Sequence, residues 1–224
     1  NHFDKMINTI NRREKFSIFK NLRKYKNYLY FEKNKEDKET DIKKILSKFK
    51  SQNLINGMSE DKEWFVKVYM PKPKIVIVGA VHIAQHLENL CNLCGFSVDI
   101  IDPRETFAAK ERFKIEKLIN KWPDEYFKEN QIDNKTAIVT LTHDPKLDDP
   151  ALFSALRSKA FYIGSLGSRK THAARLRRLK KNGYSKTEVE KINGPVGLNI
   201  YAKSPAEIAI SIISQIIKIQ NNRQ

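Results

Sequence analysis

Two glycine-containing turns carry the residues best suited to chemistry, and the stronger of them is YIGSLGSRKTHAARL, residues 162–176. Gly164 and Gly167 leave the backbone bare, Ser168 offers a hydroxyl group, and Arg169 stands where a helix begins. Unpaired N–H groups and the dipole at a helix start favour a bound anion, and arginine makes charge-assisted hydrogen bonds to phosphate. The simpler interpretation is a glycine-rich turn in which Ser168 caps the helix. We favour a phosphate-binding turn.

The second turn lies in KIVIVGAVHIAQHL, residues 74–87, where a buried strand breaks at Gly79 and continues as a helix. In the dinucleotide fingerprint G-x-G-x-x-G, the second glycine lets the backbone approach a pyrophosphate. Here Val81 occupies that place and Ala84 the third. Asp102 ends the next strand, where such folds put the acid that accepts ribose hydroxyls. The turn therefore indicates either an altered nucleotide-like site or ordinary strand-to-helix geometry.

Three further polar residues are expected at the same edge of the sheet. His82 is in the first turn of the helix after Gly79, and His143 and Asp144 follow the third strand in LTHDPKLDD. Parallel strands open their carboxyl ends onto one crevice, so these groups should converge there. A metal bound by His82, His143 and a carboxylate lacks tight ligand spacing, so no metal site is predicted.

Two other chemical signals have simpler interpretations. Cys91 and Cys94 form C-x-x-C in the second half of a helix, without a second cysteine pair, and are interpreted as small buried core residues. The basic run RLRRLKK, residues 175–181, is interpreted as a solvated helix face.

Alternating strands and helices must position these groups, and they predict a Rossmann-like, doubly wound α/β fold with helices on both faces of a parallel sheet. Two helix starts carry capping boxes, Ser185 with Glu188 and Ser204 with Glu207. Strands are expected at 74–79, 97–102, 136–140 and 160–164, and helices at 83–94, 122–130, 149–158, 170–181 and 205–219.

The part before this alternation is a short, lysine-rich segment, residues 1–70, which we interpret as a truncated or degenerate first domain. It should contain an amphipathic helix over 41–49 and a strand over 63–70. The proline pair in MPKPK then places a boundary near Pro71, so the Rossmann-like domain is expected over 71–224.

Composition excludes several classes of function. The formal charge is +16, but lysines are spread along the chain among acidic residues, so nucleic-acid binding is not favoured. The longest apolar run, residues 207–219, is well short of the roughly 20 residues that cross a bilayer. Two cysteines and the lack of a cleavable leader predict a cytoplasmic protein.

Taken in order, the motifs resemble the C-terminal domain of the XdhC family of xanthine dehydrogenase accessory proteins and the related CoxI-type proteins. The resemblance covers about residues 64–217. It rests on IVGAVHIA, DPRETFA, THDPKLD, YIGSLGSRKTHAARL and INGPVGLNIYAKSPAEIAISIISQI. Val81 and Tyr201 stand where the family has glycine, and two consequences stay open: they narrow the expected crevice, or they abolish binding.

The resemblance implies a chaperone without turnover of its own. It would bind molybdenum cofactor (molybdopterin) and pass it to a xanthine-dehydrogenase-type apo-molybdoenzyme after sulfuration by a cysteine desulfurase. By position, Gly79, Val81 and His82 would line the first turn, Asp102 and Arg104 would flank it, and His143 and Asp144 would face it. Gly164, Gly167, Ser168 and Arg169 would form the second turn, and Gly194, Pro195 and Gly197 the closing loop.

Two other functions remain open at this point. One is an NAD(P)-dependent oxidoreductase, although Val81 argues against dinucleotide binding and no hydride-transfer pair is evident. The other is an interaction module that keeps the Rossmann fold without a ligand. A homodimer is compatible with each of the three functions.

Overall fold

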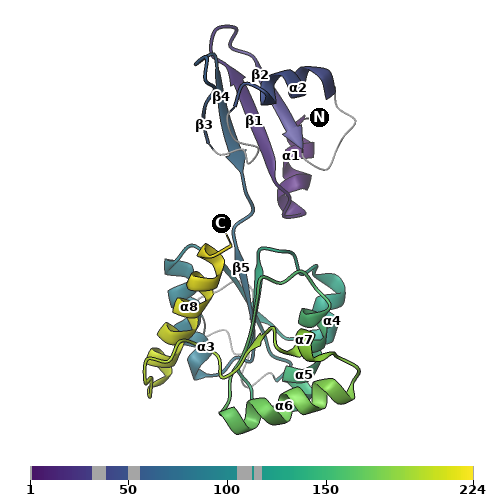
Figure 1. Ribbon diagram of the computed structural model, residues 1–224, viewed down its shortest axis with the longest axis vertical. Helices are drawn as coiled ribbons and strands as arrows, with labels where there is room; N and C mark the ends of the chain where they lie inside the picture. Colours follow the sequence, from purple (N-terminus) through teal and green to yellow (C-terminus); the bar gives the residue numbers. More distant parts are fainter. Residues whose placement is uncertain (1, 32–38, 50–55, 105–112, 114–117, 224) are drawn as a thin grey trace. The chain divides into compact units, whose positions relative to one another are not determined.

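The computed structural model describes residues 2–31, 39–49, 56–104, 113 and 118–223. The chain divides into two compact units, Asn1–Pro71 and Lys72–Gln224 (Figure 1). The division falls at the proline pair where the sequence places a boundary. That the first unit is a truncated or degenerate domain stays a prediction.

The first unit is built on a four-stranded antiparallel sheet with the order β2-β1-β4-β3. Phe19 and Trp64 anchor its small core. The sequence predicted α2 and β4 but not β1 and β2, because these short strands lie among lysines and alternate weakly. The elements are α1 (His2–Asn11), β1 (Phe16–Asn21), β2 (Asn27–Phe31), α2 (Glu39–Leu46), β3 (Gly57–Met58) and β4 (Trp64–Tyr69).

The second unit contains a six-stranded parallel sheet with the order β10-β9-β8-β5-β6-β7, which confirms the Rossmann-like α/β prediction. The central strands are buried on both faces, as parallel sheets require. The strands are β5 (Lys74–Val78), β6 (Ser97–Ile101), β7 (Leu118–Ile119), β8 (Thr136–Thr140), β9 (Tyr162–Ser165) and β10 (Ile192–Asn193).

Helices cover both faces of this sheet (Figure 1). One hydrophobic core lies under α3 and α8, and a second core lies under α4, α5, α6 and α7. The last helix buries the stripe that its sequence predicts, including Ala209, Ile212 and Ile216. The helices are α3 (His82–Leu93), α4 (Pro123–Glu129), α5 (Pro145–Leu156), α6 (Arg169–Lys181), α7 (Lys186–Val189) and α8 (Pro205–Asn221).

Local sequence signals explain most helix boundaries. Both capping boxes are present, at the starts of α7 and α8. The predicted start of α5 was wrong: the helix begins at Pro145 rather than at residue 149, because Asp144 accepts a hydrogen bond from the Lys146 N–H at 2.9 Å and caps the helix. Cys91 is buried as expected, but Cys94 is exposed because the helix ends just before it.

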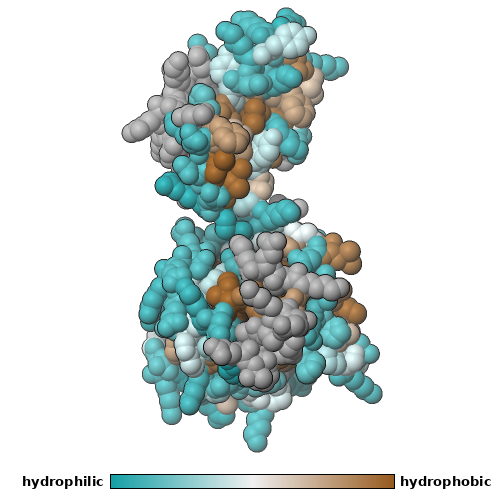
Figure 2. All heavy atoms as spheres, turned by 180° about the vertical axis from the view of Figure 1, so that it is seen from behind, coloured by the Kyte–Doolittle hydropathy of each residue, from teal (hydrophilic) through white to brown (hydrophobic). Residues whose placement is uncertain are grey.

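On the face shown in Figure 2, the hydrophobic side chains among the described residues lie in small groups between hydrophilic ones. Such scattered apolar residues are ordinary for a protein surface. Within the described residues, no helix is both long and apolar enough to span a bilayer.

Candidate functional site

The carboxyl ends of β5, β6, β8 and β9 bring the sequence-predicted residues to one edge of the sheet. From β5 the chain adds β6 and β7 on one side of the sheet, and it then returns to add β8, β9 and β10 on the other side of β5. The strand order therefore reverses between β5 and β8. Ligands of open α/β sheets bind outside the strand ends at such a switch point.

The turn after β5 is tightly closed. Gly79 has φ +109°, and a Cβ there would lie 2.5 Å from Thr142 Cγ2, so only glycine fits. Val81 is the N-cap of α3 in extended backbone, with φ −86° and ψ 173°, and His82 is exposed at the start of the helix. Val81 therefore adds bulk at the turn without straining its backbone.

Asp102 supports this turn from beneath. Its buried carboxylate accepts a hydrogen bond from the Ala80 N–H at 2.9 Å, and two from the Arg104 guanidinium at 2.8 and 2.7 Å. Burial raises the pKa of this carboxyl, but the hydrogen bonds from Arg104 and Ala80 outweigh it and leave the pKa below its ordinary value. The structure thus engages Asp102 within the protein, which does not favour the ribose contact that the sequence suggested.

The turn after β8 holds the other two predicted groups. His143 has φ +62°, a left-handed conformation that histidine adopts more readily than most residues. Asp144 caps α5, and its N–H donates to Thr142 Oγ1 at 3.0 Å. The negative charges of Asp144 and Asp148 raise the pKa of Arg104, after the larger effect of Asp102, so the β6 and β8 turns are electrostatically coupled. Among the described residues, no three histidine, cysteine or carboxylate side chains form a metal site.

The glycines at the end of β9 have separate roles. Gly164 lies inside the strand, and a Cβ there would meet Val196 Cγ2 at 2.6 Å, so its lack of a side chain allows close packing. Gly167 has φ +146° and forms the turn itself. Ser168 Oγ then accepts a hydrogen bond from the Thr171 N–H at 3.1 Å and caps α6.

A cavity of about 440 Å³ opens beside this second turn. Four predicted residues line it: Gly167, Arg169, Pro195 and Gly197. Its other lining residues are Leu166, Val196, residues 198–202 and two residues of α8, and polar and apolar atoms contribute about equally to its surface. A cavity of this volume lies within the size range of small-molecule sites.

The closing loop is fixed to α8 by specific hydrogen bonds. Gln215 Oε1 accepts from the Gly197 N–H at 2.8 Å and from the Tyr162 hydroxyl at 2.6 Å. Ser211 Oγ donates to the Leu198 carbonyl at 2.5 Å, close to where Gly197 approaches α8. This wall of the cavity is therefore preorganised.

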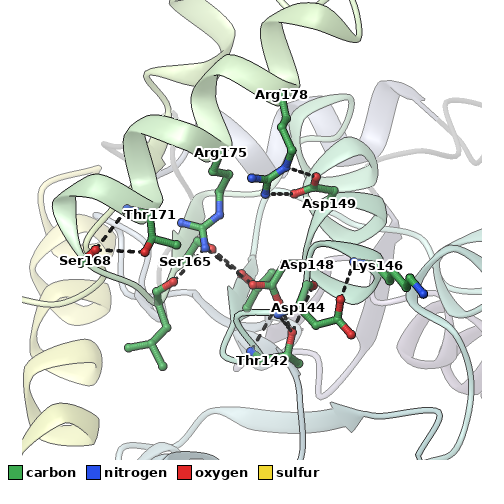
Figure 3. A network of polar contacts seen from close by, with 12 residues as sticks. Thr142, Asp144, Lys146, Asp148, Asp149, Ser165, Ser168, Thr171, Arg175 and Arg178 are labelled. Carbon is green, nitrogen blue, oxygen red and sulfur yellow. Dashed lines mark hydrogen bonds and ion pairs between the residues drawn. The ribbon is translucent and has the colours of Figure 1, made fainter.

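Arg175 of α6 and Asp148 of α5 form a buried charge pair that the sequence did not predict (Figure 3). Arg175 is only 1% exposed, donates to the Leu166 carbonyl at 2.8 Å, and has Nη2 3.6 Å from Asp148 Oδ2. Within the described part of the chain, Arg175 Nε and Nη1 have no hydrogen-bond partner. The interpretation of residues 175–181 as a solvated face was wrong here.

The burial of this pair changes the pKa of both partners. Burial lowers the pKa of Arg175 and raises that of Asp148. A sequence signal did exist: Arg175 lies four residues from both Thr171 and Leu179, so it shares the inward helix face with buried Leu179. Nearby, Arg178 binds Asp149 through Nε at 2.7 Å and Nη2 at 2.9 Å, and links α6 to α5 (Figure 3).

Comparison with known proteins agrees with this architecture. The family model of the XdhC Rossmann domain matches residues 75–216. The molybdenum cofactor insertion chaperone PaoD of Escherichia coli K12 is 35% identical over 94 residues, which are 42% of this chain and 30% of that protein. A probable xanthine dehydrogenase subunit of Bacillus subtilis 168 is 32% identical over 155 residues, 69% of this chain and 45% of that protein.

The chain thus spans less than half the length of these two curated relatives. A solved xanthine dehydrogenase structure from Bacillus halodurans has a similar fold, with a TM-score of 0.70 and 23% identity over 100% of this chain and 65% of that one. Because the family model spans most of the second unit, the chain belongs to the XdhC family.

Proposed function

We propose that this protein binds molybdenum cofactor and assists its insertion into a xanthine-dehydrogenase-type molybdoenzyme. The cavity beside Gly167 and Arg169 is the observation that carries this proposal. Molybdopterin joins a pterin ring system to a phosphate. The start of α6 and the Arg169 guanidinium suit the phosphate, and Leu166, Val196 and Ile200 offer apolar surface to the ring system.

Two features make the α6 turn the better phosphate site of the two. Gly167 removes the side chain that would cover the turn, and the guanidinium of the buried Arg175, paired with Asp148, lies beneath it, with Nη2 3.7 Å from where a Gly167 Cβ would be. The turn after β5 instead has the Asp102 carboxylate bonded to its Ala80 N–H. That backbone donor is therefore not available to a pyrophosphate, so NAD(P) is not favoured.

The relatives support the accessory part of the proposal. One is named a molybdenum cofactor insertion chaperone and another is named as part of a probable xanthine dehydrogenase. We infer that a molybdoenzyme of the xanthine dehydrogenase type receives the cofactor, in the cytoplasm. A cysteine desulfurase partner and a homodimer stay predictions from the family resemblance.

Size-exclusion chromatography with extracted molybdenum cofactor tests this function. The purified chain is mixed with the cofactor, and the protein peak is assayed for molybdenum and pterin. We expect co-elution near one equivalent. A folded protein that elutes without either component contradicts the proposal.

Substitution of Arg169 locates the phosphate contact. Arg169→Ala should weaken cofactor binding by about 1.5–3 kcal/mol, because it removes a charge-assisted hydrogen bond. Arg177→Ala is the matched control, since Arg177 is an exposed arginine of the same helix but does not line the cavity. Equal dissociation constants for the two variants would rule out the contact.

Substitution of Val81 tests whether the turn after β5 contributes. Val81→Gly should tighten cofactor binding if the ligand extends to this turn, because it restores close approach of the backbone. Weaker binding would mean that the valine side chain packs against the ligand. An unchanged constant would restrict the site to the cavity beside α6.

A further inference from the structure

Tyr201 is an unusual residue at the rim of the cavity. Its side chain is 84% exposed, its φ is +56°, and it lines the cavity together with Ile200 and Ala202. A left-handed backbone conformation costs free energy for any residue other than glycine. A ring that remains in water recovers little of this cost by burial.

Strain alone does not distinguish Tyr201, because Tyr25 in the first unit is similar. Tyr25 is 81% exposed and has φ +52°. It lies in the short connection between β1 and β2, where a hairpin turn accounts for the conformation. Tyr201 differs because it lines a cavity of about 440 Å³ that Arg169 also lines.

Two segments that line the cavity suit different parts of one ligand. The Gly167–Arg169 turn, with the buried and incompletely hydrogen-bonded Arg175 beneath it, suits an anionic group. The segment with Ile200 and Tyr201 presents apolar and aromatic surface instead. A planar heteroaromatic ring joined to a phosphate matches both ends, because aromatic side chains stack on such rings.

We propose that Tyr201 stacks on the pterin ring of a ligand whose phosphate binds at the start of α6. This inference rests on the proposed function and specifies how the ligand is recognised. Tyr201 is then a specificity-determining residue for the ring, separate from the phosphate contact of Arg169. A stacked ring also covers the exposed tyrosine, so binding offsets the cost of its conformation.

Fluorescence titration with a pterin monophosphate tests the stacking. Tyr201→Phe keeps the ring and should bind like the unchanged protein, with the same quenching of pterin fluorescence. Tyr201→Asn removes the ring but tolerates a positive φ, and should weaken binding on the order of tenfold and abolish the quenching. Its melting temperature should be equal or higher, which separates lost stacking from lost folding.

Three controls test whether the effect is specific to Tyr201 and to the pterin ring of the ligand. Tyr25→Asn removes a comparably exposed tyrosine outside the second unit and should leave binding unchanged. Inorganic phosphate should bind equally to the Tyr201→Asn variant and the unchanged protein, because it lacks a ring. Adenosine monophosphate should bind less tightly than the pterin monophosphate, and equal binding would overturn the assignment to a pterin.

The outcomes also separate this inference from the function on which it rests. If the unchanged protein binds extracted molybdenum cofactor but Tyr201→Asn binds pterin monophosphate equally well or more tightly, the stacking is wrong and the function stands. If the unchanged protein binds neither cofactor nor pterin monophosphate, both are wrong.

Discussion

The Asp102 carboxylate, at the end of β6, accepts a hydrogen bond from the Ala80 N–H in the turn after β5 at 2.9 Å. In a nucleotide-binding turn of this type, such a backbone donor is available to a phosphate. Here the protein supplies the anion itself, and Arg104 neutralises it through two short hydrogen bonds. The turn after β5, where a dinucleotide was expected, is therefore held by contacts within the protein, and the cavity beside α6 is the better ligand site.

The hydrogen bonds of the Asp102 carboxylate should make the stability of the protein sensitive to acid. Because the folded pKa of Asp102 is lowered, its contribution to stability is complete above the unfolded value of about 3.9 and is lost as pH falls through the folded value. Asp102→Asn should reduce the loss of stability below about pH 4. Urea unfolding at a series of pH values measures this, with Asp124→Asn on the exposed side of α4 as the control. An unaltered acid profile in the Asp102 variant would contradict the coupling.

The Arg175–Asp148 pair should behave as a buried ion pair. Arg175→Met or Asp148→Asn leaves one charge buried without its partner, which costs about 3–5 kcal/mol. The double variant should cost at least about 1 kcal/mol less than the sum of the single changes, because no isolated charge remains. Urea unfolding of all four proteins gives the coupling energy. Additive costs would show that the 3.6 Å separation carries no significant interaction.

The two cysteines should react very differently. Cys94 is exposed, whereas Cys91 is buried and burial raises the pKa of its thiol, so little reactive thiolate forms. A thiol-reactive disulfide reagent should modify one cysteine per folded chain and two after denaturation. Cys94→Ser should remove the rapid reaction. Rapid modification of both cysteines in the folded chain would contradict the burial of Cys91.

The sequence was most informative where periodicity and chemistry agreed. Buried strands such as β5 and β8, and helix starts with capping boxes, were predicted within one or two residues. β7 and β10 have only two residues each, too few for a periodic pattern. The antiparallel sheet of the first unit depends on pairs such as Phe19 with Val66, which are distant in sequence.

The candidate site shows the same division. Gly167 and Arg169 were visible as residue types and spacing, and both line the cavity, whereas the turn after β5 does not. Arg175 was missed because a charged residue in a lysine- and arginine-rich helix is normally exposed. The role of Asp102 was also hidden, since its hydrogen bond to Ala80 joins positions that are 22 residues apart.

Gly79 should tolerate substitution less well than Gly95. Gly95 also has a positive φ, +80°, but a Cβ there would meet nothing within 4 Å, whereas at Gly79 it would lie 2.5 Å from Thr142 Cγ2. Gly95→Ala should therefore cost about 1–2 kcal/mol for its conformation alone. Gly79→Ala should cost a further 1–3 kcal/mol, roughly, for overpacking.

A second substitution separates the two contributions at Gly79. Thr142→Ser removes Cγ2 but keeps the hydroxyl that donates to Asp148 Oδ1 at 2.7 Å. Added to Gly79→Ala, it should restore stability close to that of the Gly95→Ala variant, as measured by urea unfolding. If the double variant is no more stable than Gly79→Ala alone, contact with Thr142 does not explain the glycine, and the positive φ remains as its cause.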